Sequence, residues 1–110
     1  MRMVPQVTPA EVLGLLQHGA LVLDVREPGE WAAGRIPGSR HVPMGDLPAV
    51  WQDLPTTTST VVVCRSGVRS DAVAAALEEA GRPGCVNLAG GLKAWAASGL
   101  ALDPPFGYVA

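Results

Sequence analysis

The chain has 110 residues, of which 48% are hydrophobic and 16% are charged, and its formal net charge is −2. This length fits one globular domain over residues 1–110, and the lack of a basic run makes nucleic acid a poor candidate partner. Two cysteines, Cys64 and Cys85, are too few for a disulfide scaffold or a structural zinc site. Because no apolar stretch has the length of a signal peptide or a membrane span, we expect a soluble cytoplasmic protein with free thiols and no membrane partner, metal or cofactor.

The first half of the chain alternates predicted strands and helices. Pro5 fits an edge position for a short strand over residues 3–7. Thr8 and Glu11 form a capping box at the start of a helix that Gly19 ends. The next predicted elements are a buried strand over 20–25, a short helix over 28–34, a turn over 36–38, a short strand over 40–43 and a helix over 46–51 that Asp46 caps.

A polar loop over residues 55–60 leads to the most apolar strand, the β-branched run 61–63, which suits a strand buried on both faces of a parallel sheet. In the tail, Phe106 and Tyr108 are expected to pack back on the domain, with contact to a partner as the alternative. Strands that alternate with helices predict an α/β fold with a mainly parallel central sheet of about five strands and helices on both faces. The remaining predicted elements are a helix over 71–80, a strand over 85–88 and a helix over 92–97.

Cys64 stands where the central strand ends and a short loop leads into a helix. Ligands of parallel sheets bind beyond the carboxyl ends of the strands. At such a turn several backbone N–H groups and the positive end of the helix dipole meet, so a thiol there has a depressed pKa. Arg65 and Arg69 add positive charge. The pattern therefore predicts that Cys64 is a thiolate nucleophile in an active-site loop.

Two blocks of the chain carry a family resemblance. The first block is Leu23-Asp24-Val25-Arg26-Glu27-Pro28-Gly29-Glu30-Trp31 with Gly34-Arg35-Ile36-Pro37-Gly38-Ser39. The second block is Val61-Val62-Val63-Cys64-Arg65-Ser66-Gly67-Val68-Arg69-Ser70, continued by Asn87-Leu88-Ala89-Gly90-Gly91-Leu92-Lys93-Ala94-Trp95. With these blocks the chain resembles a single-domain rhodanese, a sulfurtransferase of the thiosulfate:cyanide type. Arg35 departs from the family, which usually has histidine before Ile-Pro-Gly, and we interpret this position as structural.

The resemblance implies a double displacement through a persulfide on Cys64. The thiolate attacks the outer sulfur of an anionic donor such as thiosulfate, and cyanide or a thiol then removes that sulfur, with ping-pong kinetics. The backbone N–H groups of residues 65–69 are expected to hold the persulfide, and Arg65 and Arg69 are expected to bind the anion. The alternative for either arginine is that it points away and pairs with a surface carboxylate. Ser70 is expected to cap the following helix and can donate to the sulfur. The substrate-binding residues so assigned are Arg65, Ser66, Gly67, Val68 and Arg69.

Three other functions remain open. Cysteine phosphatases have five residues between cysteine and arginine, whereas four separate Cys64 from Arg69, so the loop favours sulfur over phosphate and also over arsenate. A non-catalytic protein-binding module is disfavoured because Cys64 and its loop are complete. A persulfide carrier that moves sulfur from one protein to another would have the same sequence. Ser66, in place of a cation, weakens a preference for thiosulfate and keeps the carrier open.

Other polar and aromatic residues have structural interpretations. Cys85 begins a strand and is interpreted as a small buried hydrophobe. Asp24, Arg26 and Glu27 are expected to form a hydrogen-bond and ion-pair cluster below the loop. The three tryptophans are expected in the core: Trp31, Trp51 and Trp95.

Overall fold

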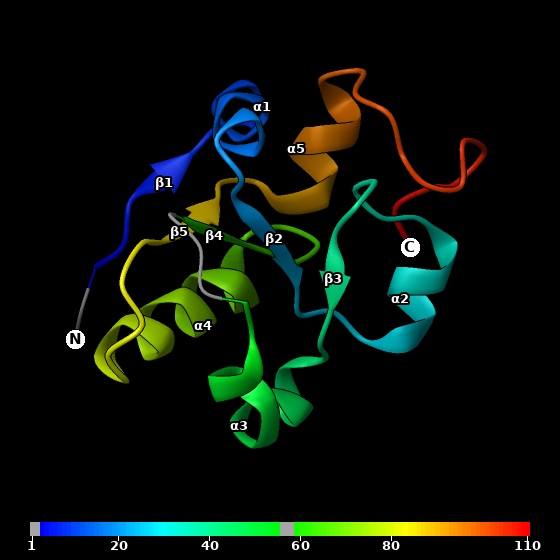
Figure 1. Ribbon diagram of the computed structural model, residues 1–110. Helices are drawn as coiled ribbons and strands as arrows, with labels where there is room; N and C mark the ends of the chain where they lie inside the picture. Colours follow the sequence, from blue (N-terminus) through cyan, green and yellow to red (C-terminus); the bar gives the residue numbers. More distant parts are fainter. Residues whose placement is uncertain (1–2, 56–58) are drawn as a thin grey trace.

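The structure, a computed structural model, describes residues 3–55 and 59–110. Within these residues one parallel sheet has the strand order β1-β5-β4-β2-β3 (Figure 1). The predicted α/β fold with a five-stranded parallel sheet is therefore confirmed, with the predicted edge strand at the edge. The predicted polar loop over 55–60 falls partly on 56–58, which lie outside the described residues. The strands are β1 Gln6–Val7, β2 Leu21–Asp24, β3 Arg40–His41, β4 Thr60–Val63 and β5 Cys85–Leu88.

The central strand β4 is buried on both faces, as its β-branched sequence predicts. Val61, Val62 and Val63 are each 0% exposed. Successive side chains of a strand point to opposite faces. Val62 accordingly joins one hydrophobic cluster, while Val61 and Val63 join the other. The strand that precedes Cys64 is therefore packed between two hydrophobic clusters. This packing fixes the position of Cys64.

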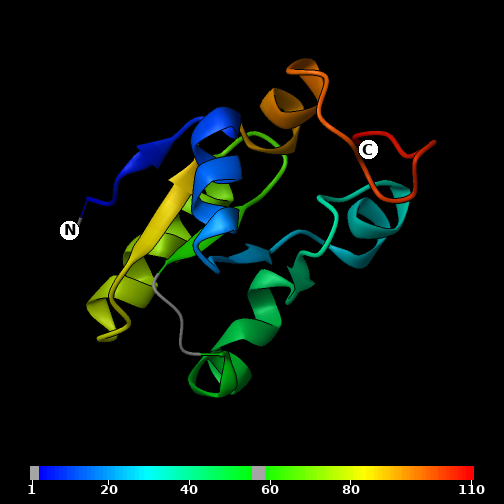
Figure 2. The same cartoon turned by 45° about the horizontal axis from the view of Figure 1, so that its top comes forward.

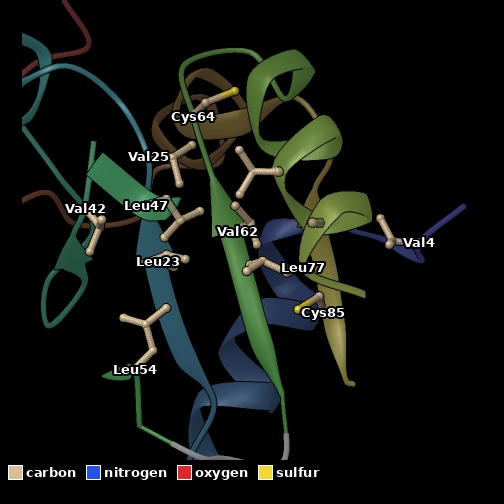
Figure 3. Packing of buried hydrophobic residues seen from close by; sticks show 12 residues of the cluster. Val4, Leu23, Val25, Val42, Leu47, Leu54, Val62, Cys64, Leu77 and Cys85 are labelled. Carbon is tan, nitrogen blue, oxygen red and sulfur yellow. The ribbon is translucent and has the colours of Figure 1, made fainter. Parts of the chain in front are cut away.

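Helices cover both faces of the sheet, as predicted (Figure 1). On one face, α1 and α5 contribute Val12, Leu92 and Trp95 to the core. On the other face, α3 and α4 contribute Leu47 and Leu77, with Cys64 in the same cluster (Figure 3). The helices are α1 Pro9–Gln17, α2 Pro28–Ala33, α3 Leu47–Val50, α4 Val68–Glu79 and α5 Gly91–Ala97, with short 3-10 turns η1 Met44–Asp46 and η2 Trp51–Asp53.

The capping box of α1 is confirmed. The backbone N–H of Thr8 donates to Glu11 Oε1 over 3.0 Å, and the N–H of Glu11 donates to Thr8 Oγ1 over 3.2 Å. Asp46 does occupy the N-cap of α3, but its side chain makes no capping bond.

The prediction that Ser70 caps α4 is wrong. The helix begins at Val68, three residues before its predicted start, and its N-cap is Gly67 with a left-handed φ of 96°. This glycine turns the chain straight into the helix, so the last loop residues become the first helical turn. Ser70 then lies inside the helix and is 0% exposed. Helix propensity alone does not reveal such a turn.

The tail after α5 returns along the molecule to α2, where Figure 2 shows it beside that helix. Arg35 and Asp103 form an antiparallel bridge, and the N–H of Tyr108 donates to the carbonyl of Ala33 over 3.0 Å. The expectation that aromatic side chains pack back is wrong, because Phe106 is 87% and Tyr108 is 65% exposed. The tail is attached through these backbone bonds and through the partly buried side chains of Leu100, Leu102 and Val109.

None of the helices in the described part of the chain is both long enough and apolar enough to cross a membrane.

Candidate active site

Cys64 lies directly after β4, at the carboxyl edge of the sheet, and its side chain turns toward the start of α4 (Figure 3). It is 1% exposed. The two cysteines lie at opposite ends of the sheet, because Cys85 pairs in register with Thr60 at the start of β4. Four residues of strand separate these positions, about 13 Å, which is too far for a disulfide. Both thiols are free.

The sulfur of Cys64 is surrounded by hydrogen-bond donors. The N–H of Gly67 donates to Sγ over 3.1 Å, and Ser70 Oγ lies 3.2 Å from Sγ. Burial raises the pKa of Cys64, while the Ser70 hydroxyl and the backbone N–H groups of Ser70, Gly67 and Ser66 lower it, so that the pKa lies below the ordinary value. The direction agrees with the thiolate predicted from the sequence.

The first turn of α5 holds the active-site loop from behind. The N–H of Leu92 donates to the carbonyl of Cys64 over 2.9 Å, and the N–H of Lys93 donates to the carbonyl of Arg65 over 3.1 Å. A Cβ at Gly91 would lie 2.5 Å from both carbonyl oxygens. The close approach therefore requires glycine there. The glycine pair was visible in the sequence, but its contact with the loop was not.

The loop arginines are both hydrogen-bonded within the chain. Arg69 binds Glu30 of α2 through two parallel bonds of 2.8 Å. Chiefly through this hydrogen bond, Arg69 lowers the pKa of Glu30 to about 2. Arg65 is exposed, and its Nε donates to the backbone oxygen of Ala110 over 2.9 Å. The alternative of a carboxylate partner is realised for Arg69, but the sequence did not identify Glu30 or the backbone of the tail, since neither contact follows from spacing.

The remaining residues of the predicted substrate-binding set surround the sulfur or face solvent. Gly67 is buried beneath it, whereas the side chains of Ser66 and Val68 are exposed. Val68 and Arg69 belong to the first turn of α4 and not to the loop proper.

A buried polar chain leads from Cys64 to the sheet edge, and sequence reasoning missed its central member, Asn87. Ser70 Oγ donates to Asn87 Oδ1 over 2.6 Å. Asn87 Nδ2 donates to Gln6 Oε1 over 2.8 Å and to the carbonyl of Gly67 over 3.1 Å. The available signal was a single amide in an otherwise apolar strand, β5.

The predicted structural cluster below the loop is confirmed for two of its three members. Arg26, 0% exposed, forms an ion pair with Asp24 through bonds of 2.8 to 3.0 Å and donates to the carbonyl of Gly34. Glu27 does not join them, because it is the N-cap residue of α2. Cys85 is buried as predicted, and burial raises its pKa to about 11.

The tryptophan prediction holds fully for Trp95, which is 3% exposed. Trp31 is half-buried, stacks on His41 and carries the guanidinium of Arg35 over its ring. Trp51 is also half-buried and lines an apolar cleft of about 400 Å³ between α3 and α4. Cys64 does not line this cleft.

A family model described as the rhodanese-like domain matches residues 8–98. The chain belongs to the rhodanese-like domain family. Among its curated relatives, a sulfurtransferase of Allochromatium vinosum is 39% identical over 87 residues, which cover 79% of this chain and 81% of that protein. The thiosulfate sulfurtransferase GlpE of Pseudomonas fluorescens is 36% identical over 90 residues, covering 82% and 83% of the two chains.

Solved structures of rhodanese-like proteins have the same fold as this chain. A rhodanese-related protein from Thermoplasma volcanium superposes with a TM-score of 0.82 at 30% identity, covering 89% of this chain and 96% of that chain. A thiosulfate sulfurtransferase from Pseudomonas aeruginosa gives a TM-score of 0.78 at 31% identity and covers 90% of this chain but only 20% of that chain. Together these relatives support a general sulfurtransferase activity for this rhodanese-like domain.

Proposed function

We propose that this rhodanese-like domain transfers a sulfane sulfur through a persulfide on Cys64. The thiolate attacks the outer sulfur of the donor, the bond between that sulfur and the leaving group breaks, and the leaving group, sulfite in the case of thiosulfate, departs with the electron pair. A thiol or cyanide then attacks the outer sulfur and restores the thiolate. The observation that carries the proposal is the sulfur of Cys64, which accepts the N–H of Gly67 and lies 3.2 Å from the Ser70 hydroxyl.

The loop backbone supplies what a persulfide needs. Gly67 has a left-handed φ and aims its N–H at the sulfur. In the proposal, the N–H groups of residues 65–69, including those of Ser66 and Val68, hold the negative outer sulfur, and no general base is required because the thiol is already acidic. Arg65 and Arg69 attract the donor once it displaces their present partners.

The arginine pairing favours a second candidate, a cytoplasmic persulfide carrier. A small dianion must compete with Glu30 for Arg69 and with the tail for Arg65. A donor that is itself a protein or thiol persulfide needs neither guanidinium. Saturation by thiosulfate separates the two functions: an enzyme saturates at low concentration, whereas a carrier does not.

The test is the intact mass of the purified protein after incubation with thiosulfate, and separately with a low-molecular-weight persulfide. We expect a gain of about 32 Da, one sulfur atom, which a following thiol or cyanide removes. Cys64→Ser is expected to gain nothing, and Cys85→Ser is the matched control that gains the same mass as the wild type.

A gain from the persulfide alone would identify the carrier. No gain from either donor, in a folded protein, would overturn both candidates and leave the protein-binding module.

A further inference from the structure

The hydroxyl of Ser70 has one proton and two acceptors. Its Oγ lies 2.6 Å from Asn87 Oδ1 and 3.2 Å from Cys64 Sγ. A hydroxyl can donate to only one of these acceptors at a time. Ser70 is 0% exposed and Asn87 is 2% exposed, so bulk water does not compete for the proton.

The orientation of the Asn87 amide follows from its other neighbours. The carbonyl of Gly67, 3.1 Å away, can only accept a hydrogen bond, so the NH₂ group must face it. The same NH₂ group donates to Gln6 Oε1, and Gln6 is oriented in turn by donating its own NH₂ to the carboxylate of Asp71 over 2.8 Å. The carbonyl oxygen of Asn87 is therefore left facing Ser70.

This orientation distinguishes the two protonation states of Cys64. In the thiol, Cys64 S–H donates to Ser70 Oγ while Ser70 donates to Asn87, so both contacts are satisfied. In the thiolate, the Ser70 proton turns to the sulfur, and Oδ1 loses the donor that the described residues provide. A buried acceptor without a donor costs free energy, so the short bond to Asn87 opposes ionisation of the thiol.

We propose that Asn87 is a positioning residue that sets the protonation of Cys64 by competing with the sulfur for the single hydroxyl proton of Ser70. Asn87 increases the fraction of molecules in which Cys64 is a thiol. The same competition weakens the hydrogen bond from Ser70 to a persulfide anion on Cys64. The inference deepens the proposed function and rests on it for the role of Cys64. Its test measures ionisation and not sulfur transfer, so either can fail without the other.

Charged groups near the loop act on Cys64 as well and must stay unchanged in the test. The positive charge of Arg69 on α4 interacts with Cys64, and Glu30 on α2 forms an ion pair with Arg69 that offsets this charge. The buried pair of Asp24 and Arg26 lies at the carboxyl end of β2. The other charged groups on the loop and on the adjoining elements α4 and α5 are Arg65, Asp71, Glu78, Glu79 and Lys93.

The experiment is the pH dependence of Cys64 alkylation by iodoacetamide, followed by mass, in four proteins: wild type, Ser70→Ala, Asn87→Leu and the double variant. Ser70→Ala removes a donor to the thiolate and is expected to raise the pKa of Cys64 by about one pH unit. Asn87→Leu removes the competing acceptor and is expected to lower the pKa. In the double variant the part of the Asn87→Leu effect that passes through Ser70 is expected to vanish, and any remainder measures the bond from Asn87 Nδ2 to the Gly67 carbonyl.

Gln6→Ala is the matched control, since it disturbs the NH₂ side of Asn87 and leaves Oδ1 on Ser70. Its Cys64 pKa should stay close to that of the wild type. Asn87→Val, a β-branched residue suited to a strand, replaces Asn87→Leu if the larger side chain prevents folding, as judged by circular dichroism. The proposal is overturned if the Asn87 variant leaves the pKa unchanged or raises it, if its effect is undiminished without Ser70, or if Gln6→Ala shifts the pKa equally.

Discussion

Cys64 gains its acidity from dipoles and not from a paired charge. Burial opposes ionisation, and the Ser70 hydroxyl with the loop N–H groups overcomes it. Arg69, a cation that interacts with the sulfur, is already bound to Glu30. A site built this way stabilises any anion of the right size at the sulfur. The charged residues around the loop, Arg65, Arg69 and Glu30, then select among the sulfur donors.

At the residue scale, Glu30 is predicted to limit the use of anionic donors. Glu30→Gln removes the charge and one of the two acceptors that hold Arg69, so the guanidinium becomes available to thiosulfate. We expect the KM for thiosulfate to fall about fivefold with kcat little changed, as for the loss of one partly exposed ion pair. Steady-state kinetics of the purified proteins measure both constants.

Two variants control this prediction. Glu79→Gln makes the same charge change on an exposed residue at the far end of α4 and should leave KM unaltered. Arg69→Ala should raise KM. A KM that does not respond to Glu30→Gln would assign the pair to structure alone.

At the scale of elements, the site depends on how closely α5 approaches the loop. The N–H groups at the start of α5 reach the carbonyls of Cys64 and Arg65 because Gly91 carries no side chain, and Gly90 leaves room for the Cβ of Ala94 in the next turn. These two glycines have φ values of 75° and 61°. The approach orients the loop carbonyls away from the sulfur, which leaves the N–H groups to face it.

Gly91→Ala is therefore predicted to destabilise the fold and the site together. The added Cβ would need to lie 2.5 Å from backbone oxygen atoms, in a left-handed conformation. We expect a loss of more than about 2 kcal/mol in the free energy of unfolding, measured by urea denaturation. Gly14→Ala is the matched control, because its Cβ meets open space in the middle of α1, and a gain of up to about 1 kcal/mol is expected there. Equal effects of the two substitutions would contradict the close contact.

At the scale of the whole molecule, the site is assembled from segments far apart in the sequence. Glu30 and Arg69 are 39 residues apart and join α2 to α4. Gln6 and Asn87 are 81 residues apart and join β1 to β5 beside the loop. The tail adds a third link when it meets Arg65. Loss of one such contact is therefore expected to lower the stability of the fold and to alter the site.

The link between α2 and α4 predicts a pH dependence of stability. The pKa of Glu30 is about 2 in the folded protein and 4.5 ordinarily. Because folding lowers this pKa, the stabilisation by Arg69 is complete above about pH 4.5 and is lost as the pH falls toward 2. Urea denaturation from pH 7 to pH 3 should show the wild type more stable than Glu30→Gln at neutral pH, with the difference shrinking below pH 4.5. A difference that stays constant across this range would contradict the assignment.

The sequence by itself determined the local features of this protein. Short-range sterics and hydrogen bonds specify the strands and helices. The signals are the β-branched run 61–63, the capping box of Thr8 and Glu11, and the glycine and proline residues that end the elements. Their alternation fixes a parallel α/β sheet, and that topology places Cys64 at its carboxyl edge.

Only the tertiary structure decided the partners of the site. Because Gly67 is the N-cap, α4 begins at Val68 and not at residue 71 as predicted. Ser70 is therefore a buried donor beside the sulfur and not the cap of the helix. Asn87 came to face Ser70, and Glu30 came to hold Arg69. These contacts depend on how elements pack, and the order of residues along the chain does not encode the distance between side chains on different elements.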